Sequence, residues 1–239
     1  SYYQYFRPFA VDTRGETTGI WATVNSQAAE AENAAYIWID TKDTDSLADD
    51  SYTIWQNTDI SADVTGRDFT GNYFDQEQNL LIAADYYHGV YICTDNGTAT
   101  NKADDSCAGP TGDSSPLYVF SIIKDGNGKF WLAGDQGLDY LDLAGTSAVD
   151  DDTLLRLMTR SSMGNDSLFA LSWLAGEYPT GGEVWAVTNT GRIRGINYND
   201  SYTDTLDDTT FSYLIPGFIN RIDAAYSMVR LGDDFYVAT

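Results

Sequence analysis

Short apolar segments recur along this chain at a nearly constant spacing. Each has large hydrophobic or aromatic residues at its centre, and the central positions are 21, 81, 131, 185 and 236. Successive centres lie 60, 50, 54 and 51 residues apart. A period near fifty residues is typical of a stacked or radial repeat. The pattern therefore predicts five related repeats, centred on Trp21, Leu81, Trp131, Trp185 and Tyr236.

The third repeat shows the expected strands most clearly. Residues 117–123 form an apolar run rich in β-branched and aromatic residues, which favours a buried strand. The segment 124–128 contains Asp-Gly and Asn-Gly, which favour a tight turn. Further strands are expected over 129–134 and 138–143, with a weaker fourth strand over 154–158. Each repeat is thus predicted to be an antiparallel sheet of about four strands.

A polar residue follows the second strand in four of the repeats. It is Asn25, Asp85, Asp135 or Asn189, always four positions beyond the central residue. In the last three of these repeats a glycine then opens the third strand, as a tight turn favours. The first repeat has an insertion over 26–33 instead. We expect these turns to lie at the same end of every sheet.

The third repeat resembles the blade of the two-component regulator propeller family. That blade has an apolar strand, an Asp-x-x-Gly turn, a strand like Leu-Trp-Ile-Gly-Thr, and then Gly-Leu with an aromatic strand. The corresponding residues here are 119–123, 125–128, 130–134 and 137–141. The second and fourth repeats resemble it less closely, and the first and fifth only weakly. The resemblance implies a β-propeller, but it does not imply a kinase.

Radial packing of such sheets suits the residues of each repeat. Inner strands of propeller blades are buried on both faces and the outermost strands are amphipathic. We predict an all-β fold, with residues 1–239 forming a single β-propeller domain of about five blades, and with the five central residues packed between blades. The fifth repeat reaches Thr239 where its third strand should begin. We expect the segment 2–6 to close the ring beside it, the alternative being a longer protein.

The charge of the chain restricts its partners. Acidic residues number 36 against 13 Lys and Arg, for a net charge of −23. Such a negative field opposes binding to nucleic acids and anionic membranes. No stretch of about eighteen apolar residues occurs, so we expect no insertion into a membrane. The acidic loops favour either a solvated surface or calcium, which prefers oxygen ligands. The densest runs, 40–45 and 204–208, do not match an EF-hand loop.

The two cysteines, Cys93 and Cys107, flank a polar segment. Two cysteines without further ligands nearby do not make a zinc site. We predict a disulfide between them, with two buried free thiols as the alternative. A disulfide implies an oxidising compartment, so the expected location is extracellular, on the cell surface or periplasmic.

The turns after the second strands are expected to line one face around a central channel. Carboxylate, amide, aromatic and imidazole groups gathered there suit a polar ligand such as a glycan or a metal ion. The alternative for each residue is that it only ends a strand or caps a turn. The segment 85–88 stands out because it lengthens the turn and contains the only histidine. The candidate ligand-binding residues are Asn25, Asp85, Tyr86, Tyr87, His88, Asp135, Gln136, Asn189 and Arg192.

These observations favour a binding or structural module that takes a polar ligand or a protein partner on the channel face. One alternative is a glycan-cleaving enzyme, a hydrolase or lyase, in which Asp85 and Asp135 are the paired carboxylates. Another is a subunit of an extracellular assembly that meets copies of itself. Catalysis is the less favoured hypothesis, because His88 is the only candidate histidine base and no Gly-x-Ser-x-Gly motif accompanies it.

Overall fold

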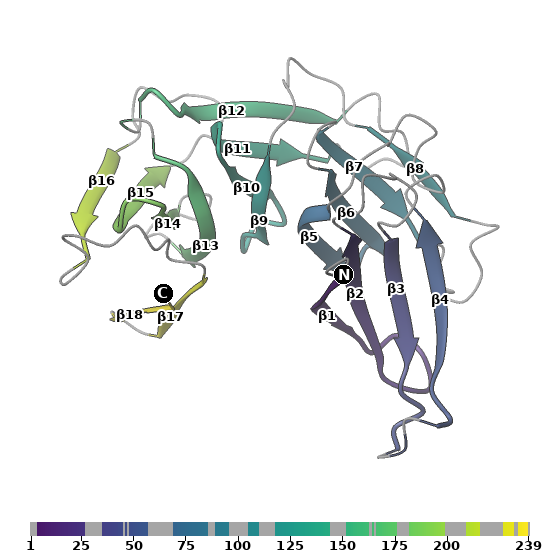
Figure 1. Cartoon of the computed structure of the whole chain (residues 1–239). Coiled ribbons are helices and arrows are strands. Elements are labelled where there is room, and N and C mark those ends of the chain that lie inside the picture. The colour runs from purple at the N-terminus through teal and green to yellow at the C-terminus, as the bar shows by residue number, and fades with distance from the viewer. Residues whose placement is uncertain are drawn as a thin grey trace. The chain divides into compact units, whose positions relative to one another are not determined.

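A computed structural model gives the fold as two compact units, residues 1–110 and 111–239. The residues that it describes are 4–26, 35–44, 46, 48–56, 69–85, 89–95, 105–109, 118–143, 152–162, 164, 166–175, 182–198, 209–215, 227–231 and 234–238. Eighteen strands and no helix occur among them (Figure 1). Accordingly, none of the described segments is a helix that could cross a membrane.

The N-terminal unit contains two antiparallel sheets of four strands, each in simple sequence order. The strands of the first sheet are β1 (Gln4–Asp12), β2 (Gly19–Ser26), β3 (Ala35–Asp40) and β4 (Ser51–Gln56). Those of the second sheet are β5 (Phe69–Asp75), β6 (Leu80–Asp85), β7 (Gly89–Thr94) and β8 (Ser106–Ala108).

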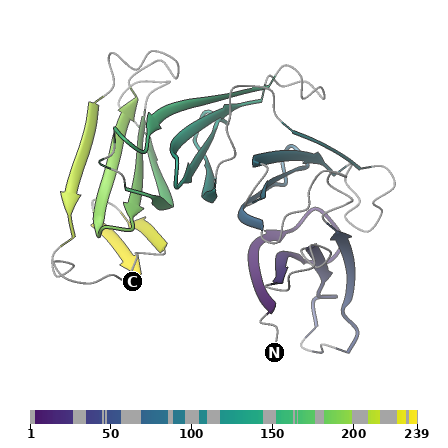
Figure 2. The ribbon, with the colours of Figure 1, turned by 45° about the horizontal axis from the view of Figure 1, so that its top comes forward.

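The C-terminal unit contains two more four-stranded sheets and a hairpin, seen side by side in Figure 2. The third sheet has strands β9 (Val119–Lys124), β10 (Phe130–Gly134), β11 (Gly137–Asp142) and β12 (Thr153–Thr159). The fourth has β13 (Leu168–Ala175), β14 (Gly182–Thr188), β15 (Arg192–Tyr198) and β16 (Thr209–Leu214). The hairpin consists of β17 (Ser227–Leu231) and β18 (Asp234–Ala238).

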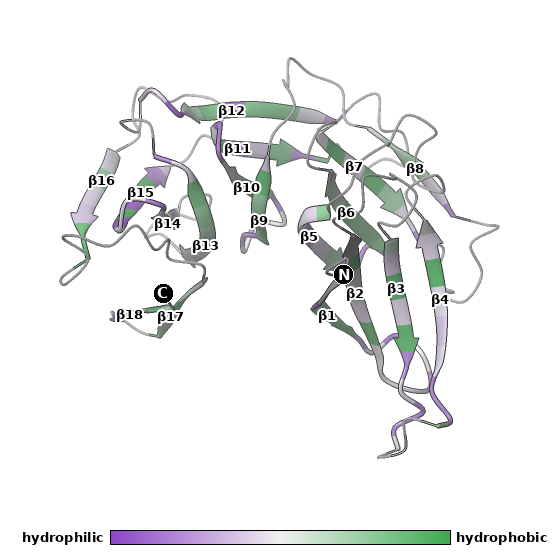
Figure 3. Ribbon diagram, in the orientation of Figure 1, coloured by the Kyte–Doolittle hydropathy of each residue, from purple (hydrophilic) through white to green (hydrophobic). Residues whose placement is uncertain are grey.

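The repeat read from the sequence is confirmed at the level of strands. Every predicted central residue lies in the second strand of its sheet, from β2 through β18, and the weak fourth strand of the third repeat is β12. Trp21, Leu81, Trp131 and Trp185 are all buried, as predicted for residues packed between sheets. Figure 3 shows how hydrophobic and polar residues alternate along strands such as β3.

Tyr236 differs from the prediction, because it is 55% exposed. Neighbouring residues of a strand point to opposite faces. Phe235 and Val237 pack on the cluster around Trp185, with the Phe235 and Trp185 ring centroids 5.1 Å apart. Tyr236 therefore lies on the other face of β18, and its role as a buried packing residue is not seen.

The N-terminal strand belongs to the first sheet. Gln4 to Phe6 pair with Ser26 to Val24 of β2, and the described strands of the fifth repeat pair only with each other. Closure of a ring by the segment 2–6, and the number of blades, stay predictions. The single-domain assignment over 1–239 likewise stays a prediction.

Aromatic side chains form much of the core between neighbouring sheets. In the N-terminal unit Trp21 packs against Trp55 and Phe74, with ring centroids 5.7 and 5.2 Å away. In the C-terminal unit Trp131 packs against Tyr198 of the fourth sheet at 4.7 Å. Such pairs add specific geometry to the hydrophobic burial of large rings. The core thus lies between faces of consecutive sheets, as radial packing requires.

The predicted disulfide is confirmed. Cys93 on β7 lies directly opposite Cys107 on β8, and their sulfur atoms are bonded. The bridge joins the three-residue outer strand to the rest of the second sheet. A closed loop of this length stabilises a fold by about 3 kcal/mol in the chain-entropy model.

Candidate functional site

The predicted site residues are only partly described. Tyr86, Tyr87 and His88 lie outside the described residues. Asn25 is the last residue but one of β2 and Asp85 is the last residue of β6, both in the N-terminal unit, and only their backbone is described. Asp135, Gln136, Asn189 and Arg192 all lie in the C-terminal unit. The predicted ring of nine residues therefore stays a prediction.

The turn between β10 and β11 carries Asp135 and Gln136 between two glycines that permit close backbone packing. A Cβ atom on Gly134 would overlap the carbonyl oxygen of Tyr118, and one on Gly137, whose φ is +139°, would overlap that of Met158. The neighbouring strands hold the turn by two hydrogen bonds. Asp135 N donates to Tyr118 O (3.1 Å), and Gln136 O accepts from Arg160 N (2.8 Å).

The carboxylate of Asp135 is only partly used within this turn. Its Oδ2 accepts a hydrogen bond from Nε2 of Gln136 at 3.1 Å. Its Oδ1 is buried and has no hydrogen-bond partner among the described residues. A hydrogen bond from any donor that reaches a buried carboxylate oxygen, including a water molecule, is stabilising. Asp135 therefore offers an acceptor that the turn itself does not satisfy.

In the turn between β14 and β15, Asn189 is hydrogen-bonded to Ser167 through both its side chain and its backbone. Asn189 Oδ1 accepts from Ser167 N at 2.9 Å, and Asn189 N donates to Ser167 O at 3.1 Å. The hydroxyl of Thr188 accepts from the backbone N–H of Thr190 (3.3 Å) and Arg192 (3.1 Å). The side-chain oxygen of Asn189 is therefore used within the fold.

The link between the third and fourth sheets connects the two turns. It begins at Arg160, bonded to Gln136, and ends at Ser167, bonded to Asn189. These hydrogen bonds place both turns at one end of the two sheets. We call this end the turn face, and define it by Asp135, Gln136, Asp166, Asn189, Thr190, Arg192 and Arg194.

Asp166 is a member of the turn face that sequence reasoning missed. It is buried, and its Oδ2 accepts from Nε and Nη2 of Arg194 at 3.1 and 2.9 Å. Its Oδ1 accepts from the Thr190 hydroxyl at 2.7 Å. The pairing joins residues 28 positions apart, so no local pattern could have indicated it. Asp166 is therefore engaged in holding the face together.

Arg192 differs from the arginines that form ion pairs in this structure. Arg14, Arg156 and Arg194 each form an ion pair with a buried aspartate. The guanidinium of Arg192 has no hydrogen bond or ion pair within the described part of the chain, although its backbone N–H is bonded to Thr188. Its five N–H donors are suited to oxygen acceptors of a ligand.

A second group of acids, of which Asp12 and Asp125 are buried and Glu183 is half-buried, accepts hydrogen bonds from the central tryptophans. Trp21 Nε1 donates to Asp12 Oδ2 (3.3 Å), and Trp131 Nε1 donates to Asp125 Oδ2 (3.1 Å). In the fourth sheet Glu183 Oε2 accepts from Trp185 Nε1 at 2.9 Å. Asp125 is the aspartate of the Asp-x-x-Gly turn, so the carboxylate of this motif acts as a structural acceptor. We call these pairs the carboxylate–indole pairs.

Arg14 extends the first of these pairs across two sheets. Its guanidinium donates to both oxygens of Asp12 and to Asp95 Oδ2, the latter at 2.6 Å. It also donates to Asn79 Oδ1 at 2.8 Å and lies 4.5 Å from the ring centroid of Phe74. Burial alone would raise the pKa of Asp12, but the hydrogen bonds from Arg14 outweigh it and lower that pKa.

The described acids do not form a metal centre. No group of three or more His, Cys, Asp or Glu that could hold a metal ion occurs among the described residues. Asp40, in the acidic run 40–45, accepts hydrogen bonds from the Lys42 ammonium and the Thr17 hydroxyl, and these contacts lower its pKa to about 2. The run 204–208 and Asp45 lie outside the described residues, so calcium binding stays a hypothesis.

The pKa of one buried acid, Asp139, is raised rather than lowered. Burial raises the pKa of Asp139, on β11, to about 6, although the guanidinium of Arg156 lowers it in part. Arg156 Nε donates to Asp139 Oδ1 at 3.0 Å from the adjacent strand β12. Asp139 lies within the third sheet rather than on the turn face. The glycosidase alternative, with Asp85 and Asp135, needs a defined carboxylate separation and stays a hypothesis.

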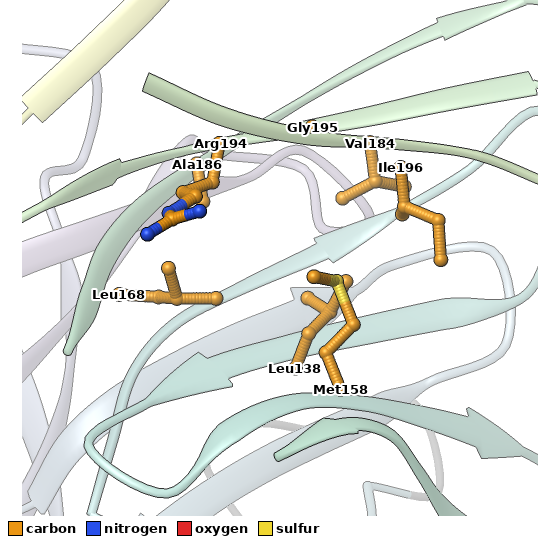
Figure 4. Close-up of a pocket in the computed structure, with 8 residues that line it drawn as sticks. All are labelled: Leu138, Met158, Leu168, Val184, Ala186, Arg194, Gly195 and Ile196. Carbon is orange, nitrogen blue, oxygen red and sulfur yellow. The ribbon is translucent and has the colours of Figure 1, made fainter. Parts of the chain in front are cut away.

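A small apolar cavity lies between the third and fourth sheets (Figure 4). Leu138 and Met158 line one side, and Val184 and Ile196 line the other. Its volume is about 10 Å³, which is close to the least that one water molecule needs. It is therefore a packing gap rather than a ligand site.

The comparisons with known proteins identify the fold. A structure of PorZ, an essential bacterial surface component of the type-IX secretion system of Porphyromonas gingivalis, matches with a TM-score of 0.52 and 15% identity. The β-propeller domain of Cps50 (Swd1) from Myceliophteria thermophila matches with a TM-score of 0.56 and 10% identity. The chain is an all-β protein with the β-propeller fold.

The matches differ in how much of each protein they cover. With PorZ, 79% of this chain corresponds to 25% of the other, and with Swd1, 88% corresponds to 58%. The chain therefore spans a quarter of PorZ and somewhat over half of the Swd1 domain. No protein-family model and no curated protein matches the chain. The likeness of the third repeat to the two-component regulator propeller stays a resemblance.

Proposed function

We propose that this chain is the binding module of an extracellular or cell-surface protein, and that its turn face holds a polar, hydroxyl-rich ligand of the glycan class. The observation that carries the proposal is Arg192. It is a charged donor on a face where Asp166 and Arg194 already satisfy each other, and it has no acceptor within the described part of the chain. A ligand hydroxyl or ring oxygen would supply that acceptor.

Neighbouring amides support the same ligand class. Gln136 Oε1 and Asn189 Nδ2 have no hydrogen-bond partner among the described residues, while the other side-chain atom of each amide is held within its turn. Hydrogen bonds within the turns hold these donors and acceptors in place. Polar groups that are fixed in this way orient a polar ligand. Because the turns are already ordered, little conformational entropy is lost on binding.

Two further observations support the location. The disulfide between Cys93 and Cys107 is stable in an oxidising compartment. PorZ, which shares the fold, is a bacterial surface component. The net charge of −23 disfavours nucleic acid and anionic membranes as partners.

The test is a screen of the purified chain on an array of glycans, followed by calorimetry with each glycan that binds. Arg192→Ala should weaken binding by tenfold or more. Lys129→Ala is the matched control, because Lys129 lies at the opposite end of the third sheet and pairs with Asp142. Repeating the titrations in calcium and in chelator tests a bound cation. Equal affinity of the Arg192 variant, the Lys129 variant and the parent protein would contradict the proposal.

A further inference from the structure

Arg192 is the outermost of a row of side chains on one face of the fourth sheet. Residues two apart on a strand point to the same face, so Arg192 and Arg194 share a face of β15 with Ile196 and Tyr198. Ile196 and Tyr198 belong to the core between the third and fourth sheets. Figure 4 shows Arg194 and Ile196 on the side of β15 that faces the third sheet. Arg192 is the member nearest the β14–β15 turn, so it lies where this interface meets the turn face.

The row changes from apolar to charged as it approaches the turn. Its inner members are buried, whereas Arg194 and Arg192 are half-buried. Asp166 accepts two hydrogen bonds from the guanidinium of Arg194 and a third from the Thr190 hydroxyl. A carboxylate has about four acceptor positions, so Asp166 is largely occupied. Arg192 lies about 7 Å further along β15, and it forms no ion pair within the described part of the chain.

An arginine without an acid beside it is unusual in so acidic a chain. The chain carries 36 acidic residues against 13 Lys and Arg. In the described structure, ion pairs with aspartate are formed by Arg14, Lys42, Lys129, Arg156 and Arg194. A guanidinium that is partly removed from water and has no anion beside it is stabilised by an anion that a ligand brings. The acceptor for Arg192 is therefore expected to be charged as well as polar.

The residues opposite this row on β16 suit a sugar. Leu214 lies directly opposite Arg192 and is 45% exposed, and Ser212 lies opposite Arg194 and is also exposed. Directly opposite residues of an antiparallel pair lie on the same face. Leu214 offers apolar surface to the C–H face of a sugar ring, and the Ser212 hydroxyl can donate to or accept from a sugar hydroxyl. A charged donor, a hydroxyl and an apolar surface are thus combined beside the turn.

We infer that the turn face binds an acidic glycan, and that a carboxylate or sulfate group of this glycan pairs with the guanidinium of Arg192. The inference rests on the proposed function and narrows its ligand. The planar guanidinium can donate two parallel N–H bonds to either anionic group, which favours an anion over a neutral hydroxyl. The net charge of −23 repels an anion at long range. Salt screens this repulsion beyond about 8 Å at physiological ionic strength, whereas the pairing is a direct contact.

The test uses an array of oligosaccharide pairs that differ only in the anionic group. Each uronate oligosaccharide is matched with its methyl ester, and each sulfated oligosaccharide with its desulfated form. Pairs that bind are titrated calorimetrically into the purified chain at about 0.15 M salt, with chelator present so that no cation bridges ligand and protein. The anionic member should bind tenfold or more tightly than its neutral counterpart. The pairs that show this difference identify the group as carboxylate or sulfate.

Three variants assign the preference to one residue. Arg192→Gln should abolish the preference for the anionic member. Arg192→Lys keeps the charge but not the planar fork, so it should retain part of the preference. Lys129→Gln removes one positive charge at the opposite end of the third sheet and should leave the preference unchanged. Melting curves check that each variant is folded.

The outcomes separate this inference from the proposed function. Neutral members that bind as tightly as the anionic ones would overturn the inference and leave the proposed function standing. An array on which no glycan binds would overturn both. A preference for the anionic member that survives Arg192→Gln, or that Lys129→Gln removes equally, would overturn the assignment to Arg192 and with it the inference.

Discussion

Removing the carboxylate of Asp125 tests whether the carboxylate–indole pairs stabilise the packing of consecutive sheets. Asp125 is 5% exposed, and both oxygens of its carboxylate accept hydrogen bonds. Its Oδ1 accepts from the backbone of Asn127 (2.8 Å) and Lys129 (3.0 Å), which closes the β9–β10 turn. Its Oδ2 accepts from Trp131 Nε1 and Tyr198 Oη, both at 3.1 Å.

The magnitude follows from the two buried donors. Trp131 and Tyr198 are fully buried, so Asp125→Ala takes their shared acceptor from two groups that water cannot easily reach. Each loss of this kind costs about 1–3 kcal/mol. We therefore expect the free energy of unfolding to fall by about 4 kcal/mol, measured by urea denaturation followed by tryptophan fluorescence.

Two companion variants separate this effect from the loss of negative charge. Asp142→Ala removes a surface carboxylate of the same sheet, paired with Lys129, and should cost less than about 1 kcal/mol. Tyr198→Phe removes one of the two donors and should reduce the cost of Asp125→Ala in a double-mutant cycle by about 1 kcal/mol. If Asp125→Ala costs no more than Asp142→Ala, the reasoning is wrong.

Three further predictions follow from the structure. Folding raises the pKa of Asp139 from 3.8 to about 6, so the folded state binds this proton more tightly than the unfolded state does. The resulting contribution to the free energy of unfolding is fully present below pH 3.8 and is lost as the pH rises through about 6. The stability of the parent relative to Asp139→Asn should thus fall by about 3 kcal/mol between pH 3 and pH 7 in denaturation curves. Reducing the bond between Cys93 and Cys107 should lower the free energy of unfolding by about 3 kcal/mol, and Cys107→Ser should remove the response to reductant. Gly137→Ala should reduce the melting temperature much more than Gly89→Ala, because both glycines have positive φ but only Gly137 is pressed against a neighbouring strand; equal reductions would contradict this.

Much of the fold could be predicted from short-range pattern. Trp131 was placed in a second strand because apolar residues surround it and turn residues flank it, and β10 lies there. The disulfide could be predicted because only two cysteines flank one loop. Tyr236 could not be placed correctly, because its exposure depends on which face of β18 meets the fourth sheet.

The candidate site could be predicted less well than the fold from local sequence pattern. Asn189 was identified at the right turn, but its side-chain oxygen serves Ser167, 22 residues earlier. Asp166 was missed, because its place in the turn face depends on hydrogen bonds from Arg194 and Thr190. These residues approach Asp166 only after the sheet forms. The aspartate of the Asp-x-x-Gly turn was read as a turn former, and its bond to Tyr198 could not be foreseen.

The amino-acid sequence alone determined the strands, their turns and the fifty-residue period, because these depend on residues close together in the chain and on the two-residue alternation of a strand. The tertiary structure decided which polar groups form the hydrogen bonds that hold the sheets together. That choice rests on contacts such as Arg14 with Asp95 and Tyr198 with Asp125, which join residues 81 and 73 positions apart. Local pattern carries no information about such partners, since only the packing of whole sheets brings them within hydrogen-bond distance.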